Sequence, residues 1–504
     1  MLRETITENG AVRGLPGTDA RITVYKGIPY AAPPVGKNRW RAPQPADNWQ
    51  GMRECFEFGP INMQRTPGVD PEAFYSREWH VDPKIPMSED SLYLNIWTPA
   101  KPADEKLPVM IWIFGGGFQE GYSYEMEFDG ERIASRGVIL VSIGYRLNAF
   151  GFLSHPDLSR EDPEHPTNFG LLDQLFAFRW VQRNIANFGG DPENLTIFGQ
   201  SAGGDAVYAH LCSPQSRGAF QKAIVESNGA FTYQYPKTFL TRVRPTLPEA
   251  EEKGERFLRE ALGVDTIEEA RKLDAAFIES KQLEWGLFAI PVVDQKFLLR
   301  DMPQSVIKNE LQDIPFLIGN TTGEFMVGPE GDSPEEVLAW AKENFGDRGQ
   351  EYFDIVCREA QESGKTLREA ATISSFQLGA QLAVETLSRN GRRPWYYRFG
   401  PTIPGDDAGA YHSCDLWFEF ETLIRCWRPF DGHHFDLARR MCNYRTNFAN
   451  TGDPNGTDPA GLPMPEWKPY SPEEKNEIRF LDEISVSTEQ SEKRRFLIDI
   501  NIGS

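Results

Sequence analysis

The sequence has no long apolar run and comparatively little positive charge. No window of its 504 residues approaches the roughly eighteen consecutive apolar residues of a membrane-spanning helix. Acidic residues outnumber basic ones by 74 to 53, and the formal charge is −21. Nucleic acids and anionic membranes are polyanions, so this charge argues against both as partners.

Cysteine is also scarce and irregularly spaced. The six cysteines include no CxxC pair, which removes the usual signature of a zinc site or a redox motif. The first residues, Met1–Thr7, lack the apolar core of a secretion signal. From these two absences we expect a reduced protein of the cytoplasm.

The clearest positive feature is a serine flanked by glycines, in the run Gly199-Gln200-Ser201-Ala202-Gly203. It follows the apolar run Leu195–Phe198 and precedes small residues that can open a helix. A serine on a sharp strand-to-helix turn has an exposed hydroxyl, and the glycines permit the close approach of the backbone. The pattern predicts that Ser201 is a nucleophile and that the protein is a serine hydrolase.

Three successive glycines, Gly115–Gly117, directly follow an apolar run that ends at Phe114. Glycines at this point allow the backbone to expose its N–H groups without side-chain obstruction. Taken alone, such a run is a flexible turn. Together with the serine motif, it predicts an oxyanion hole that the N–H of Ala202 would complete.

Histidine is rare, with seven in the chain, and the order serine, acid, histidine leaves four candidates for the base. His210 lies on the helix expected to carry Ser201, about two and a half turns away. His433 and His434 lie at an expected helix start, and although adjacent histidines suggest a metal, no third ligand is evident. His412 follows the strand-like run 395–399 in a loop of small residues, where a catalytic base is expected.

Two acidic residues lie just after strand-like runs in the interval where the acid is expected. Asp294 ends the run 291–294, and Glu324 ends the loop 319–324. Their spacing barely separates them. Glu324 is slightly favoured because its glycine-flanked loop leaves a better-defined strand.

Strand-like and helical patterns alternate through the first half of the chain, which is typical of an α/β fold with a mostly parallel sheet covered by helices. Charged helical stretches at about 235–283 and 334–390 resemble insertions between strands. No linker, repeat or low-complexity tract separates the parts. We expect one catalytic domain over residues 1–504.

Several ordered motifs resemble the type-B carboxylesterase family, which includes the cholinesterases, and in particular its bacterial-type carboxylesterases. The similarity begins near Gly14 and continues into the C-terminal region. The matching segments are Gly27–Gly36, Ser88–Asn95, Gly115–Phe118, Gly144–Arg146, Phe198–Gly204, His412 in its loop and Phe448–Asn455. The resemblance implies the α/β-hydrolase fold.

The resemblance also implies roles for individual residues. It assigns Ser201 as nucleophile, Glu324 as acid and His412 as base, and it makes Asp294 a structural residue. The remaining assignments are oxyanion donors at Gly116, Gly117 and Ala202, a supporting residue at Ser227, an acyl pocket at Trp285 and Leu287, an alcohol side at Val327, and structural ion pairs Arg39–Glu89 and Arg146–Asp173.

The chain departs from the family pattern at four positions. Ser91 replaces a cysteine, so the usual disulfide cannot form. Gln200 replaces a frequent glutamate beside the nucleophile, and Gly323 replaces the usual aspartate before the acid. Trp79 lies out of register with the choline-binding tryptophan of the cholinesterases, so cholinesterase activity is not expected.

These features predict a carboxylic ester hydrolase that acts on soluble short-chain or aromatic esters through an acyl-enzyme, without metal or organic cofactor. A carbohydrate acetyl or feruloyl esterase and a lipase are alternatives, although the segment Met63–Met87 is more polar than a lipase lid. A non-catalytic adhesion or scaffold protein is an alternative of another class. The sequence specifies neither the ester nor the oligomeric state.

Overall fold

The computed structural model describes all residues except 71, 80–81, 231–243, 459–460, 463 and 504. The chain divides into two compact units, and each is described by itself. The first unit contains residues 1–224, 244–301 and 416–464, and the second contains residues 225–243, 302–415 and 465–504. Strand β10 (Lys222–Glu226) leads the chain from the first unit into the second.

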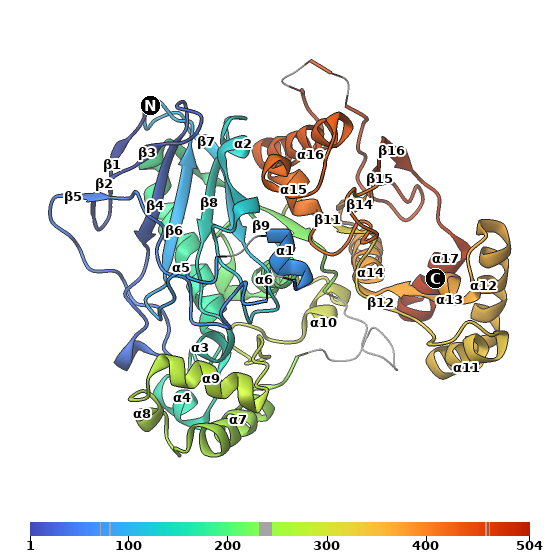
Figure 1. Ribbon diagram of the computed structural model, residues 1–504, viewed down its shortest axis with the longest axis horizontal. Coiled ribbons are helices and arrows are strands. Elements are labelled where there is room, and N and C mark those ends of the chain that lie inside the picture. The colour runs from blue at the N-terminus through green and yellow to red at the C-terminus, as the bar shows by residue number, and fades with distance from the viewer. Residues whose placement is uncertain (71, 80–81, 231–243, 459–460, 463, 504) are drawn as a thin grey trace. The chain divides into compact units, whose positions relative to one another are not determined.

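A twisted sheet forms the core of the first unit (Figure 1). Strand β7 pairs in parallel with both β8 and β9, while β6, β4 and β3 continue the sheet in antiparallel pairs. The strands in spatial order are β9 (Gly190–Gln200), β7 (Leu107–Ile113), β8 (Ile139–Ile143), β6 (Tyr93–Thr98), β4 (Thr23–Pro29) and β3 (Leu15–Pro16). A separate sheet joins β1 (Glu4–Thr7), β2 (Gly10–Arg13) and β5 (Met52–Glu54).

Apolar side chains explain why the central strands are interior. Val109–Ile113 of β7 and Ile139–Val141 of β8 are completely buried, as expected for parallel strands covered on both faces. Register pairs Ile111 of β7 with Val141 of β8 and with Ile197 of β9. This register brings the ends of β7 and β9, and hence the glycine run and Ser201, to one edge of the sheet.

Helices cover this sheet, and α5 and α6 contact β9 (Figure 1). Helix α5 buries the apolar positions expected from its sequence, including Leu172, Trp180 and Val181. The helices associated with this unit are α1 (Phe74–Trp79), α2 (Glu131–Ala134), α3 (Asn148–Phe152), α4 (Pro156–Glu161), α5 (Phe169–Asn184), α6 (Ala202–Cys212), α7 (Leu247–Arg256), α8 (Ile267–Ala270), α9 (Ala275–Trp285), α15 (Asp415–Glu419) and α16 (Gly432–Thr451).

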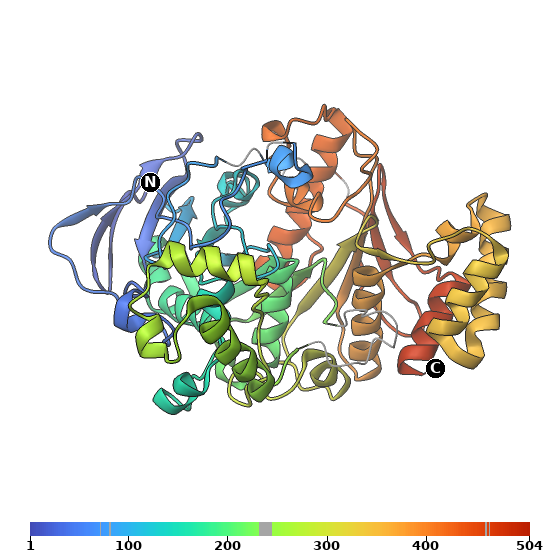
Figure 2. The ribbon, with the colours of Figure 1, turned by 60° about the horizontal axis from the view of Figure 1, so that its bottom comes forward.

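The predicted insertion at 235–283 is helical over its described part, since α7, α8 and α9 occupy it (Figure 2). Helices α7 and α8 begin with capping boxes, Thr246 with Glu249 and Thr266 with Glu269. Such boxes satisfy backbone N–H groups that a helix start leaves unpaired. Residues 235–243 of the predicted insertion lie outside the described residues.

The second unit has its own strands and helices. Strands β11 and β14 are parallel, as are β14 and β15, and β16 pairs antiparallel with β15. Their bounds are β11 (Phe316–Thr321), β14 (Trp395–Phe399), β15 (Glu477–Phe480) and β16 (Ile484–Ser487), and a short antiparallel pair joins β12 (Met326–Val327) to β13 (Ile373–Ser374). The parallel strands and covering helices of the two units confirm the predicted α/β class.

The insertion predicted at 334–390 is also helical, apart from β13. Its helices are α11 (Pro334–Phe345), α12 (Gly349–Ser363), α13 (Leu367–Ala371) and α14 (Ser375–Arg389), and α10 (Met302–Ile307) and α17 (Glu492–Ile502) complete the unit. Figure 2 shows α11 and α12 beside the C-terminal α17. Rings of Phe345, Tyr352 and Phe496 pack there at centroid distances of 4.4 to 5.4 Å.

Within the described ranges, no helix combines the length and the apolar character needed to cross a bilayer. The prediction of one catalytic domain over residues 1–504 stays a prediction, because the two units are described separately.

Candidate active site

Ser201 lies on a sharp turn between β9 and α6. Its backbone has φ 57° and ψ −121°, a conformation that L-residues rarely adopt, and it is the N-cap of α6. The two flanking positions have no room for a side chain. A Cβ at Gly199 would lie 2.6 Å from the backbone of Gly203, and a Cβ at Gly203 would lie 2.0 Å from the carbonyl oxygen of Ile113. The local structure is the strand–turn–helix that the sequence predicted.

The glycine run lies against this turn. A Cβ added at Gly115 would approach the Gln200 carbonyl oxygen to 2.7 Å and the Ser201 Cβ to 3.2 Å. Gly116 and Gly117 have φ values of +95° and +64°, in the region that favours glycine. The sheet register therefore places the predicted oxyanion loop and the predicted nucleophile side by side.

Hydrogen bonds fix the direction of one predicted donor. The carbonyl oxygen of Gly116 accepts the N–H groups of Gln119 and Glu120, at 2.9 and 3.1 Å. Because the N–H and C=O of a trans peptide point in opposite directions, the Gly117 N–H points away from that pair of bonds. Ala202 is the first residue of α6, where backbone N–H groups have no partner within the helix.

In the second unit, His412 and Glu324 form a buried pair. The His412 Nδ1 lies 2.5 Å from the Glu324 Oε2, and the Thr321 N–H donates to the Glu324 Oε1 at 2.9 Å. Both residues are less than a tenth exposed. The Gly323 N–H donates to the Ala410 carbonyl at 2.9 Å and joins the two loops that carry the pair. Two residues far apart in the sequence, both predicted, are thus brought together.

Two phenylalanines surround the His412 imidazole, and the sequence analysis missed both. Phe325 lies 4.9 Å from the imidazole and Phe376 lies 5.4 Å from it, measured between ring centroids, with the Phe376 ring nearly parallel to the imidazole. The strand pair β12–β13 joins the segments that carry them. Phe325 follows the predicted acid directly, but nothing in its neighbours indicates which way its ring points.

The alternative base and the alternative acid are engaged elsewhere. His210 is fully buried in the first unit, with Nδ1 2.8 Å from the Ser216 Oγ and Nε2 2.9 Å from the Gln174 Oε1. Burial lowers the pKa of His210 to about 3. Asp294 accepts three backbone N–H bonds on one carboxylate oxygen and the Asn168 amide on the other. Both residues hold structure together.

His433 and His434 have an acidic neighbour, Asp431, which the sequence analysis did not identify as a third possible metal ligand. Asp431 lies 2.5 Å from the His433 Nδ1 and 3.0 Å from the His434 Nδ1, and the ligand atoms of all three residues lie within 4.8 Å of one another. Asp431 is also the N-cap of α16, and the His434 Nδ1 accepts the Asp431 N–H in a capping box. Helix capping accounts for this arrangement.

The predicted supporting residues occupy ordered positions. Gln200 ends β9 and is almost completely buried. Ser227 has a left-handed backbone, and its N–H donates to the Gly319 carbonyl of β11 at 2.8 Å. Val327 lies in β12, paired with Ile373.

The predicted acyl-pocket residues lie at the end of α9. The Trp285 ring packs against Phe257, and its N–H donates to Glu260, so this side chain contacts the helical insertion. Leu287 is buried. The neighbouring Phe288 is 57% exposed, and its ring tip lies 3.8 Å from where a Cβ on Gly117 would stand. The sequence analysis did not identify Phe288, whose ring lies beside the oxyanion loop.

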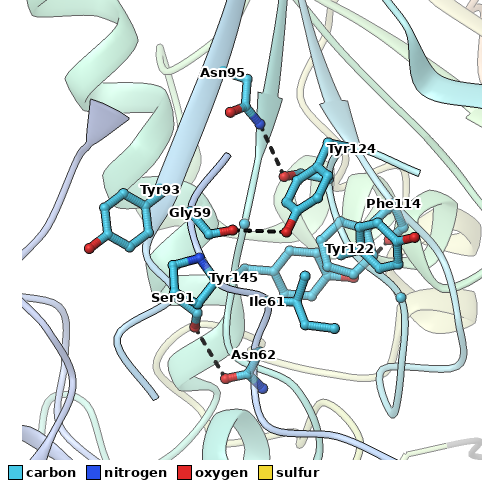
Figure 3. Close-up of a pocket in the computed structure, with 14 residues that line it drawn as sticks. Gly59, Ile61, Asn62, Ser91, Tyr93, Asn95, Phe114, Tyr122, Tyr124 and Tyr145 are labelled. Atoms are coloured by element: carbon cyan, nitrogen blue, oxygen red, sulfur yellow. Dashed lines mark hydrogen bonds between the residues drawn. The ribbon is translucent and has the colours of Figure 1, made fainter. Parts of the chain in front are cut away.

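The expected ion pairs form. Arg39 donates two bonds of 2.6 Å to Glu89, and Arg146 donates two bonds of 2.7 Å to Asp173. Ser91, which stands where the family has a cysteine, donates to the Asn62 side chain at 3.3 Å. Figure 3 shows this bond at the edge of a small pocket lined by Tyr93, Phe114, Tyr122, Tyr124 and Tyr145.

Two glutamates beyond the oxyanion loop also escaped the sequence analysis. Glu127 is fully buried, and Glu125 accepts the Tyr122 N–H at 2.8 Å. Burial raises the pKa of Glu125 to about 7 and raises the pKa of Glu127 well above its ordinary value, with each carboxyl group close to the other. Nothing in the run 121–128 distinguishes them from surface residues.

Comparison with known proteins gives a consistent result. The model of the Carboxylesterase family matches residues 3–496. The para-nitrobenzyl esterase of Bacillus subtilis is 32% identical over 502 residues, covering 97% of each chain. Fumonisin B1 esterase of Sphingopyxis macrogoltabida is 35% identical over 439 residues, covering 83% of this chain and 74% of that protein. A solved carboxylesterase of Geobacillus stearothermophilus has a TM-score of 0.79 and 30% identity, with 98% of this chain and 99% of that one covered.

Proposed function

Because the chain belongs to the carboxylesterase family and is a carboxylic ester hydrolase, we propose that Ser201, His412 and Glu324 perform the hydrolysis. The observation that carries the proposal is the strained turn at Ser201 beside the glycine loop. The buried His412–Glu324 pair supports the assignment of base and acid. Ser201 belongs to the first unit, and the other two residues belong to the second.

In the proposed reaction, the His412 Nε2 takes the Ser201 proton while Oγ attacks the ester carbonyl carbon. The N–H groups of Gly116, Gly117 and Ala202 stabilise the negative oxygen that forms. The imidazolium then gives its proton to the departing alcohol, and an acyl-enzyme remains. Water, deprotonated by His412, attacks the acyl carbon. The imidazolium then returns that proton to the Ser201 Oγ as the ester bond breaks, which releases the carboxylic acid and restores free Ser201.

Glu324 has a defined task in this scheme. Its carboxylate accepts the Nδ1 proton of His412, so the lone pair of the neutral imidazole is on Nε2, and it stabilises the imidazolium in both half-reactions. None of these steps uses a metal or an organic cofactor.

The substrates we propose are small esters with short-chain or aromatic acids. The polar character of the segment Met63–Met87 favours soluble esters over an oil surface. We also propose a reducing cytoplasmic setting, which is supported by the buried thiols of Cys55 and Cys442 and by the serine at position 91.

Labelling with a fluorophosphonate tests the assignment. The wild-type protein should react in a 1:1 ratio, and Ser201→Ala should abolish both labelling and hydrolysis of p-nitrophenyl acetate. Ser135→Ala, which removes an exposed serine that bonds the Arg132 carbonyl, is the matched control and should react like the wild type. An unreactive wild-type protein would favour the scaffold interpretation, and full activity of Ser201→Ala would refute the nucleophile.

A further inference from the structure

The oxyanion loop is held by side-chain amides as well as by its own backbone. Gln119, which follows the glycines in sequence, donates from its Nε2 to the Gly117 carbonyl at 3.1 Å and to the Ala289 carbonyl at 2.6 Å. A primary amide has two N–H bonds to donate, so both are used. One side chain thus connects the glycine loop with the segment that follows α9.

The first of these bonds fixes a peptide group of the loop. With the Gly116 carbonyl held by the N–H groups of Gln119 and Glu120, and the Gly117 carbonyl held by the Gln119 side chain, two successive peptide planes have a defined orientation. Glycine imposes no such preference by itself. The N–H of Gly117, one of the proposed oxyanion donors, lies in the same peptide plane as the Gly116 carbonyl, and the plane held by the Gln119 side chain adjoins it at the Gly117 Cα.

The second bond reaches the segment Leu287–Ala289. Leu287 and Ala289 are buried, and Phe288 between them approaches Gly117. The Leu287 N–H donates to the Gln282 carbonyl at 2.9 Å, and the Gln282 side chain accepts the Ala149 N–H at 2.9 Å. The segment is therefore fixed at its start by α9 and at its end by Gln119.

We propose that Gln119 is a positioning residue for ester hydrolysis, which couples the orientation of the Gly117 N–H to the placement of the segment Leu287–Ala289. This inference rests on the proposed function, because it takes Gly117 as an oxyanion donor. An acyl group that displaces Phe288 or Ala289 pulls on the Ala289–Gln119 bond and so shifts Gln119, whose side chain holds the Gly117 carbonyl and whose N–H holds the Gly116 carbonyl. The Gly116–Gly117 peptide, which carries the Gly117 N–H, turns with it. Acyl size then influences the rate of the chemical step as well as substrate binding.

The test compares Gln119→Met with the wild type on p-nitrophenyl esters from acetate to octanoate. Methionine has a similar length but no donor, so both bonds are lost. Loss of one oxyanion donor lowers the rate by about 10²–10³. For misalignment of a donor that remains present, we expect kcat for the acetate to fall by roughly 10- to 100-fold, with KM changed less than about threefold, and a smaller fall for the octanoate.

Gln182→Met is the matched control. Gln182 also donates a side-chain amide bond, to the Gly218 carbonyl at 2.8 Å, but it is a half-buried residue of α5 whose side-chain oxygen accepts from Arg179, and these bonds do not involve the glycine loop. This variant should keep both kcat and the acyl-length profile. A Gln119→Met enzyme that hydrolyses every ester within twofold of the wild-type rate would overturn the proposal.

Gln119→Lys covers the case in which the methionine variant fails to fold. The lysine ammonium has three donors and can reach the two carbonyls, so recovery of kcat to within about fivefold of the wild type supports the positioning role. A folded Gln119→Lys enzyme whose kcat falls by the roughly 10- to 100-fold expected for Gln119→Met contradicts that role. Failure of the proposed function is a separate result, because it would appear as activity in Ser201→Ala whatever stands at position 119.

Discussion

Replacing Glu324 by glutamine gives a sharp test of the proposed relay. The Glu324 Oε1 accepts the Thr321 N–H at 2.9 Å, and the Oε2 faces the His412 Nδ1 at 2.5 Å. In Glu324→Gln, the amide oxygen is the group that can continue to accept the Thr321 N–H. The amide NH₂ therefore turns toward the His412 Nδ1, which must then accept a hydrogen bond.

This change inverts the imidazole tautomer. When Nδ1 accepts, the ring proton moves to Nε2, and Nε2 can no longer take the proton of Ser201. The variant also lacks the negative charge that stabilises the imidazolium. We expect kcat to fall about 10³–10⁴-fold, which corresponds to roughly 4–5 kcal/mol of transition-state stabilisation. KM should change little, because Glu324 does not act on the bound ester.

Steady-state kinetics with p-nitrophenyl acetate and the rate of fluorophosphonate labelling measure this loss. Asp294→Asn is the matched control, since Asp294 was the other acid left open by the spacing. This substitution replaces a carboxylate that accepts backbone N–H groups with a neutral amide. The free energy of unfolding should therefore fall, while kcat stays within a few-fold of the wild type. If Asp294→Asn is the inactive variant and Glu324→Gln retains wild-type kcat, the assignment is wrong.

Three further predictions concern stability. Burial lowers the pKa of His210 to about 3, so below pH 6.5 the unfolded chain binds a proton that the folded chain does not, and the wild type loses stability as the pH falls. Between pH 7 and pH 5, His210→Gln should therefore lose about 2 kcal/mol less free energy of unfolding than the wild type, as measured by urea unfolding. The pKa of Glu125 is raised to about 7, so its contribution is present below pH 4.5 and lost as the pH rises through 7; Glu125→Gln should therefore be roughly 1–3 kcal/mol more stable than the wild type at pH 8 and equal to it at pH 4, and an unchanged difference at both pH values would contradict this. Gly203→Ala places a Cβ 2.0 Å from the Ile113 carbonyl oxygen and should lose more than about 3 kcal/mol in a thermal melt, whereas Gly432→Ala, at a helix start with open space, should not.

The elements that the sequence predicted well are those with local rules. The strand before Ser201, the glycines that flank it and the helix after it are specified by residues within a few positions of one another. The two helical insertions were likewise visible, because charged residues and caps such as Thr266 with Glu269 act over one turn. For such segments, steric limits and capping leave few alternatives.

The choice of acid and base depended on more than local rules. Spacing left Asp294 and Glu324 nearly equal, and the resemblance to a family chose between them. In the structure, Asp294 holds the backbone of 296–298, whereas Glu324 faces His412, and these contacts support the proposal of Glu324 as the acid. Which loop follows which strand is readable from sequence, but which two loops meet depends on the order of strands in the sheet.

The interactions around the site could not be predicted from the sequence, because they too depend on which distant segments meet in the fold. Phe325 and Phe376 contact His412, yet they come from segments that only the short β12–β13 pair joins. Glu125 and Glu127 have shifted pKa values because the chain around them excludes water, and a run of sequence carries no sign of that burial. Trp285, predicted to face the acyl group, contacts Phe257 and Glu260.

The glycine loop illustrates the limit most directly. Three glycines indicate that the backbone can adopt unusual conformations. Because glycine permits many conformations, the three residues do not specify which one the loop adopts. Bonds from the nearby Gln119 and Glu120 orient the loop, and residues distant in sequence hold those neighbours in place. The Gln64 side chain exchanges two bonds with the backbone of Gly121, 57 residues away, the Asn148 side chain holds the Gln119 carbonyl across 29 residues, and Gln119 holds Ala289 across 170. A motif of permissive residues thus predicts where an oxyanion hole can form, while the side-chain amides that tie it down decide its geometry. Variation at those amides, with the glycines unchanged, is therefore where we expect enzymes with this loop to differ in rate and acyl preference.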